Sequence, residues 1–266
     1  QPWLQGTGVY VPHAKGQDAS DSGQFGLAFR FPVDKIDTEI GLYAMNIHNR
    51  LPISSSVVGT TPADLQRINP VAYGALELLF DNLAAPVLLI PGNHDVPAEL
   101  ERRFTHEPFQ VGGTRVLGNW AVVMLSSWYA NAQDGEGQLG LAELARLEDS
   151  LAAHRERHVL VCLHHQPMPM EAAGLDALGL GDAEPFMAVI RRHPQVRAVA
   201  WGHAHQSLDV FRGGVRYLCT PSTCMQFKPR DAGFVIDDRP PGYRVMDLYD
   251  DGGIATEVVW LEGYRQ

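Results

Sequence analysis

Short, nearly continuous apolar runs alternate with amphipathic stretches from about residue 80 to the end of the chain. Such runs predict β-strands that are buried on both faces. They cover residues 86–90, 120–125, 159–163 and 196–201. Glycine pairs within residues 210–219 and 243–260 predict two β-hairpins near the C-terminal end.

Two of the amphipathic stretches predict helices. The first has leucines spaced three, three and four residues apart, which places them on one helical face: Leu141, Leu144, Leu147 and Leu151. Asp182 followed by Pro185 indicates the start of the second helix. Its inner face is expected to carry Phe186, Val189 and Ile190. Strands alternating with helices are typical of an α/β fold. Because the sequence contains no repeat and no linker, residues 1–266 are expected to form one domain.

The first 60 residues have a weaker pattern. Gly8–Val11 and Ser54–Val58 are expected to be strands, and the spacing of Thr38–Arg50 predicts a helix.

Composition narrows the function classes. The net charge is −10 and the pI is near 5.5, which argues against a broad electrostatic surface for nucleic acid. No apolar run approaches the length of a membrane span. The cysteines, Cys162, Cys219 and Cys224, are odd in number and indicate no disulfide framework. Because the chain starts at Gln1 without a basic and apolar leader, no secretory signal is expected, and a reducing, cytoplasmic location is predicted.

Three polar clusters follow predicted strands: Gly92–Asp95, His164-His165 and Gly202–His205. In α/β sheets, ligands collect beyond the carboxyl ends of the strands. Imidazole nitrogens with amide and carboxylate oxygens suit divalent Mn, Fe, Co or Zn. Two histidines two residues apart on an extended segment point to opposite sides, so His203 and His205 can serve two adjacent ions.

Each cluster also has a purely structural interpretation. Asn93, His94 and Asp95 fit a turn with a cap, and His164 and His165 fit one core and one surface histidine. The gathering of so many histidines at strand ends nevertheless favours a metal site over three unrelated structural roles.

The order Gly-Asn-His-Asp, His-His, Gly-His-x-His resembles the calcineurin-like metallophosphoesterases. Residues 220–229 and 241–244 are similar to motifs of the class III bacterial cyclic 3′,5′-AMP phosphodiesterases. The resemblance covers roughly residues 35–262 and leaves residues 1–35 divergent. It implies a four-layer α/β/β/α sandwich with a dinuclear metal site.

The resemblance also implies the metal ligands, for two divalent ions with Mn or Fe favoured over Zn or Co. Asn93, His164 and His203 match the ligands of one ion, with His164 preferred over His165 because it directly ends the strand. His205 matches a ligand of the second ion. Asp64 is expected to bridge the ions, although an N-cap after Pro62 is an alternative.

The sequence departs from the family at its N-terminal end, where an Asp-x-His triplet should supply two ligands to the second ion. The segment 11–13 ends in His13 but has valine in place of the aspartate, and Asp21 is followed by glycine where the histidine belongs. Replacement ligands could come from Asp18, Asp21 or His48. The second metal site is thus depleted, rebuilt from elsewhere or empty.

The implied activity is hydrolysis of cyclic AMP to 5′-AMP by in-line attack of a metal-bound hydroxide. His94 would be the general acid, oriented by Asp95, while His165 would contact the phosphate and Phe227 would stack on the adenine. The alternatives are hydrolysis of other small phosphodiesters and a degenerate protein that binds metal or nucleotide without turnover. The expected partner is a small molecule rather than nucleic acid or membrane, and the protein is expected to be a monomer or homodimer.

Overall fold

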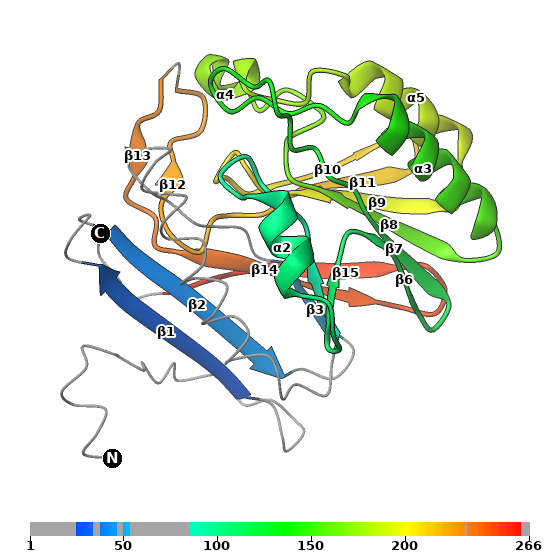
Figure 1. Ribbon diagram of the computed structural model, residues 1–266, viewed down its shortest axis with the longest axis horizontal. Coiled ribbons are helices and arrows are strands. Elements are labelled where there is room, and N and C mark those ends of the chain that lie inside the picture. Colours follow the sequence, from blue (N-terminus) through cyan, green and yellow to red (C-terminus); the bar gives the residue numbers. More distant parts are fainter. Residues whose placement is uncertain (1–24, 34–37, 47–49, 54–85, 232, 262–266) are drawn as a thin grey trace.

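The computed structural model describes residues 25–33, 38–46 and 50–53 as strands, and residues 86–231 and 233–261 with their side chains (Figure 1). The two largest β-sheets formed by these residues pack face to face, and helices lie on the outer sides. In this part of the chain, no helix is long and apolar enough to span a membrane.

The larger sheet has six strands in the order β10–β11–β9–β8–β7–β6. Its four central strands are parallel: β7 (Trp120–Met124), β8 (His158–Leu163), β9 (Val196–Trp201) and β11 (Val215–Cys219). The edge strands are antiparallel to their neighbours: β6 (Gly113–Leu117) and β10 (Leu208–Arg212). The predicted strands in these regions and the hairpin within residues 210–219 are confirmed.

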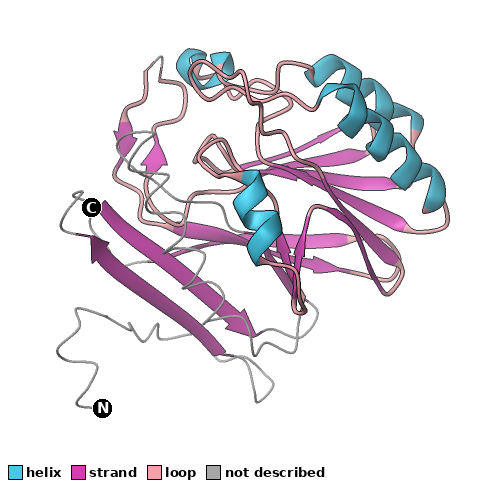
Figure 2. Cartoon of the chain, viewed as in Figure 1, coloured by secondary structure: helices cyan, strands magenta, loops and turns pink. Residues whose placement is uncertain are grey.

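Helices cover one face of this sheet (Figure 2). They are α3 (Gly140–Ala153), α4 (Ala173–Ala177) and α5 (Ala183–Arg192). Side chains alternate across β8, because successive residues of a strand point to opposite faces. Val159 and Val161 pack in the core beneath the helices, whereas Leu160 and Cys162 pack toward the second sheet. The predicted inner face of α5 is confirmed, since its three apolar residues are buried.

The second sheet is antiparallel, in the order β15–β14–β3, with strands β3 (Arg50–Ile53), β14 (Gly242–Leu248) and β15 (Ile254–Trp260). Met246 is fully buried between the sheets, and Leu248 and Ile254 pack beside it. The hairpin predicted at Gly252-Gly253 is therefore confirmed.

The fourth layer is α2 (Pro97–Arg103), which lies over the parallel pair β4 (Val87–Leu89) and β5 (Phe109–Val111). Leu88 of β4 packs in the core between the sheets. Its neighbours Val87 and Leu89 point the opposite way and pack with Leu100 and Phe104. Helix, sheet, sheet and helix follow one another, which confirms the predicted α/β/β/α sandwich.

The prediction of a helix at Thr38–Arg50 is wrong. Residues Thr38–Asn46 form strand β2, which pairs antiparallel with β1 (Phe25–Val33) over its full length. Ile40, Leu42 and Ala44 alternate with other residues at the period of a strand, and Gly41 disfavours a helix interior. The strands predicted at Gly8–Val11 and Ser54–Val58 lie outside the described residues.

The apolar face predicted for α3 is correct at three of its four leucines. Leu147 and Leu151 are fully buried and Leu144 packs against the same core, but Leu141 is 88% exposed. At about 100° per residue, Leu141 lies about 120° around the helix from Leu147. It therefore falls at the edge of the buried face, in the first turn.

We expect Leu147→Ala to lower the free energy of unfolding by about 2–5 kcal/mol, because it leaves a cavity in the core. Leu141→Ala in the same helix removes an equal volume from an exposed position and should change that free energy by no more than about 0.5 kcal/mol. Urea denaturation of both variants measures the difference. Equal effects would contradict the described packing of α3.

Candidate functional site

The three polar clusters meet at one edge of the sandwich. His164 and His165 follow β8, His203 and His205 follow β9, and Asn93 lies just beyond β4. Because Leu163 pairs with Trp201 across β8 and β9, the residues after these strands begin side by side. The backbone N–H of Gly202 then donates a hydrogen bond to the carbonyl of His164 (3.1 Å).

Three candidate ligand atoms converge at this edge. His164 Nε2 lies 2.9 Å from Asn93 Oδ1 and 3.2 Å from His203 Nδ1. Two ligands about 2.1 Å from one ion and 90° apart are separated by about 3.0 Å, which matches both distances. The donor set of one amide oxygen and two imidazoles therefore fits a divalent cation. The structure brings together Asn93, His164 and His203, as the ligand prediction requires.

Gly92 makes this approach feasible, because a Cβ atom there would lie 2.8 Å from His164 Cε1. The turn that holds Asn93 is closed by Asp95. Its Oδ2 accepts the N–H of Gly92 (2.8 Å), and its own N–H donates to the carbonyl of Gly92 (3.1 Å). Asp95 thus shapes the turn in addition to carrying its charge beside His94.

The segment after β9 is not extended, contrary to the premise used for His203 and His205. Both residues have positive φ angles, 49° and 48°, in the left-handed region that costs non-glycine residues roughly 1–3 kcal/mol. The rings nevertheless face different neighbours, as expected. The His203 ring contacts the rings of His164 and His165, whereas the His205 ring stacks on Phe227.

Two ring nitrogens of this segment are buried, and the one on His205 supports ligand binding. Within residues 86–231 and 233–261, neither His203 Nε2 nor His205 Nδ1 has a hydrogen-bond partner. A buried polar atom without a hydrogen-bond partner lowers the stability of the fold by roughly 1–3 kcal/mol. A cation bound to the lone pair of such a nitrogen would remove this penalty. The site thus fits a metal through its converging ligands, to which His203 contributes Nδ1, and through the buried Nδ1 of His205.

The histidines of the site are held in the neutral form that metals require. Burial lowers the pKa of His164 and His203 well below its usual range, and mutual repulsion with neighbouring histidines lowers it further. Burial also lowers the pKa of His165 and His205 to about 4. The pKa of His94 is lowered by desolvation and is partly restored by the charge of Asp95.

His165 is fully buried and its two ring nitrogens have protein neighbours. Nδ1 lies 2.7 Å from the hydroxyl of Ser127, and Nε2 lies 3.0 Å from the carbonyl of Gly135. A Cβ atom at Gly137 would lie 2.2 Å from the same ring. The sequence analysis did not single out Ser127. This serine follows β7, so the expectation that functional residues lie beyond the carboxyl ends of strands could have identified it.

Phe227 is half-buried and lies against His205, not in open solvent. The two rings are stacked at 5.1 Å between centroids, with an angle of 17° between their planes. The backbone N–H of Phe227 also donates to the carbonyl of His205 (3.2 Å). Phe227 thus fixes the orientation of the His205 ring, whatever contact it makes with a substrate.

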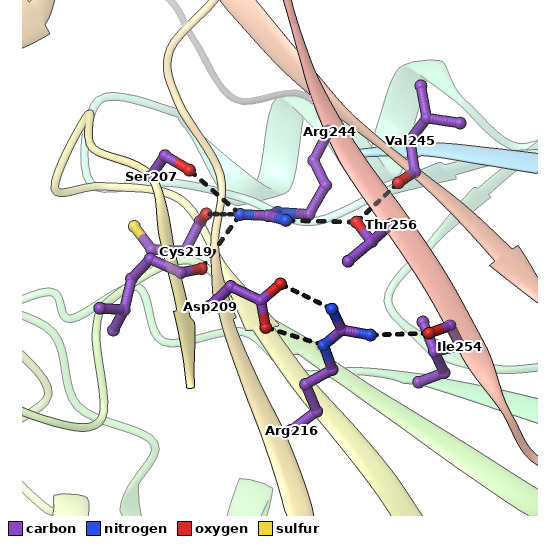
Figure 3. Close-up of polar contacts among 9 residues, drawn as sticks. Ser207, Asp209, Arg216, Cys219, Arg244, Val245, Ile254 and Thr256 are labelled. Carbon is purple, nitrogen blue, oxygen red and sulfur yellow. Dashed lines mark hydrogen bonds and ion pairs between the residues drawn. The ribbon is translucent and has the colours of Figure 1, made fainter. Parts of the chain in front are cut away.

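Arg244 holds the loops beneath the site (Figure 3). It extends from β14, is 2% exposed, and donates through Nη2 to the carbonyls of Leu208 (3.0 Å) and Cys219 (2.9 Å). Its Nη1 donates to the Thr256 hydroxyl (3.2 Å). One guanidinium therefore fastens the second sheet to the ends of β10 and β11, which flank the histidine loop.

Several predicted site residues cannot be placed. Asp64 and the candidate replacement ligands lie outside the described residues: His13, Asp18, Asp21 and His48. Their roles stay predictions. His94 is exposed at the rim of the site, with Nε2 3.4 Å from Asn93 Nδ2.

The chain is similar to curated bacterial enzymes. The 3′,5′-cyclic adenosine monophosphate phosphodiesterase CpdA of Pseudomonas aeruginosa is 37% identical over 190 residues, which are 70% of this chain and 68% of that protein. CpdA of Escherichia coli K12 is 37% identical over 182 residues, 68% of this chain and 66% of that one. CpdA of Vibrio vulnificus is 35% identical over 173 residues, which are 64% of this chain and 61% of that protein. The chain thus spans 61–68% of the length of these relatives.

Among solved structures, a dimetal phosphatase from Danio rerio superposes with a TM-score of 0.53 at 13% identity, over 75% of this chain and 80% of that one. Residues 3–134 match a family described only as a protein of unknown function, DUF1302. Fold and histidine cluster together define a calcineurin-like metallophosphoesterase. Within that class, the chain belongs to the family of the CpdA cyclic AMP phosphodiesterases.

We expect metal-free protein to lose stability as the pH falls from 7 to 5. The folded-state pKa of His165, about 4, lies below its ordinary value of 6.5, so the unfolded chain binds more protons between these values. The stabilisation is complete above pH 6.5 and decreases toward pH 4, by up to about 1.4 kcal/mol per pH unit.

Urea denaturation at several pH values in chelator measures this slope. His165→Asn should reduce it, because the substituted side chain does not titrate. A free energy of unfolding that is constant between pH 7 and pH 5 would contradict the neutral state of the buried histidines.

Proposed function

We propose that the protein hydrolyses cyclic 3′,5′-AMP to 5′-AMP with two divalent metal ions. The observation that carries the proposal is the convergence of three candidate ligand atoms: His164 Nε2 lies within 3.2 Å of both Asn93 Oδ1 and His203 Nδ1. The chain in which they converge is 37% identical to a cyclic AMP phosphodiesterase. The substrate class is a small cyclic nucleotide.

We assign Asn93, His164 and His203 to one ion and His205 to the second, with Asp64 as the bridging carboxylate. Imidazole with amide and carboxylate oxygen suits Mn or Fe, and also Zn or Co. When bound, the ions would lower the pKa of a water molecule and neutralise the charge that develops on the phosphoryl oxygens.

Hydrolysis adds a water oxygen to phosphorus and releases the 3′-oxygen, which must gain a proton. His94 is the proposed donor, since its exposed ring lies at the rim beside Asn93. The charge of Asp95 favours the protonated imidazole against desolvation. His165 engages Ser127 and Gly135 through its ring nitrogens, which favours a role in holding the loop over contact with the phosphate.

We infer a cytoplasmic location from the thiols and the substrate class. Burial raises the pKa of the Cys162 and Cys219 thiols to about 12, so both stay protonated and unreactive at neutral pH. The three cysteines form no disulfide with one another.

The direct test is hydrolysis of cyclic AMP by the purified chain with added Mn²⁺. We expect formation of 5′-AMP that chelator abolishes and Mn²⁺ restores. Metal binding by titration without turnover of cyclic AMP or other small phosphodiesters would reject the proposal in favour of a catalytically inactive binding protein.

We expect His94→Ala to lower kcat by about 10²- to 10⁴-fold, the usual effect of losing a general acid. The variant should keep its metal, measured by elemental analysis after gel filtration. His106→Ala, which removes an exposed histidine after α2, should leave kcat unchanged. Loss of metal from His94→Ala would identify His94 as a ligand instead of an acid.

A further inference from the structure

The hairpin of β12 (Gln226–Phe227) and β13 (Ile236–Asp237) presents an apolar face on the side of the candidate metal ligands. Phe227 pairs with Ile236 across the two strands, so their side chains lie on the same face. The ring of Phe234 contacts the ring of Phe227, with 5.7 Å between centroids and an angle of 73°. The hairpin stands apart from the two main sheets (Figure 1).

The rings of His205, Phe227 and Phe234 form a continuous series. Phe227 stacks on His205 at 5.1 Å, so one face of Phe227 is covered by a candidate metal ligand. Phe234 is the outermost ring and is 51% exposed. Among the described residues in contact with this series, Phe234 offers the open aromatic surface.

The tip of the hairpin exposes three consecutive apolar side chains. Phe234, Val235 and Ile236 are 51%, 43% and 52% exposed. Apolar groups gathered in this way on a surface usually mark a place where another molecule binds. Here only the ring of Phe227 separates the exposed group from His205, which favours a ligand that also reaches the metal ligands.

We propose that Phe234, with Ile236 beside it, is the subsite for the aromatic base of the substrate. This inference rests on the proposed hydrolysis of a cyclic nucleotide. Such a molecule carries its base one sugar ring away from its phosphate, so a phosphate at His205 directs the base toward the outer end of the ring series. Every base has a π-face that can stack on an aromatic side chain. The apolar face of the hairpin would therefore bind a base by stacking and not by hydrogen bonds to its edge. The assignment thus moves base stacking from Phe227, which holds His205, to Phe234.

Steady-state kinetics of Phe234→Ala with Mn²⁺ test the assignment. Loss of one stacking partner should raise KM for cyclic AMP by about 5- to 150-fold and leave kcat nearly unchanged. Ribose 3′,5′-cyclic phosphate, which lacks the base, should have the same KM with wild type and variant. Phe234→Trp should keep the wild-type KM for cyclic AMP.

Phe211→Ala is the matched control, because Phe211 is 68% exposed on the edge strand β10. It should leave both KM values unchanged. Hydrolysis of cyclic AMP by wild type with no effect of Phe234→Ala would overturn the base subsite alone. Absence of hydrolysis of either substrate by wild type would overturn the proposed function and the subsite with it. Analytical ultracentrifugation could instead show that Phe234→Ala changes from dimer to monomer while its KM stays the same. The apolar face of the hairpin would then be a contact between two copies of the chain, which would also overturn the subsite.

Discussion

The register between β8 and β9 determines whether the candidate ligands meet. Both strands are buried on both faces over most of their length, so alternation of side chains does not by itself specify their pairing. Val159 pairs with Val196 but Leu160 pairs with Ala198, which leaves Arg197 as an extra residue in a bulge. Arg197 is anchored by a hydrogen bond from its Nε to the carbonyl of Gly252 (3.1 Å). A shift of one residue would move β9 by about 3.3 Å, as much as the present distance between His164 Nε2 and His203 Nδ1.

Local patterns predicted the α/β fold and the convergence of its histidines, because both depend on apolar runs and on polar residues where those runs end. The four layers of the sandwich were implied by the resemblance to the metallophosphoesterases. The sequence could not predict what each imidazole contacts. The partners of His165 are Ser127 and Gly135, which lie 38 and 30 residues away in the chain. The burial of one face of Phe227 by His205 also depends on tertiary packing. At Thr38–Asn46, pairing with the neighbouring strand β1 decided between two periodicities.

The N-terminal part of the chain is where the resemblance to metallophosphoesterases fails, and it also matches a different family. The missing Asp-x-His triplet belongs within residues 3–134, which match the family of unknown function. That range includes Asn93, so the two relationships overlap at the candidate site. The donor atoms of Asn93, His164 and His203, which follow β4, β8 and β9, converge among the residues that the structure describes with side chains.

The buried guanidinium of Arg244 has a consequence for motion. Packed layers commonly move by shear, in which one layer slides slightly over another. Arg244 spans the two sheets, and its acceptors at Leu208 and Cys219 lie at the ends of the strands that flank the histidine loop. Sliding of the sheets would break several hydrogen bonds of a buried cation at once. Arg244 therefore opposes sliding of one sheet over the other beneath the ligands, whereas the short hairpin β12–β13 lies at the margin, away from this anchor (Figure 1).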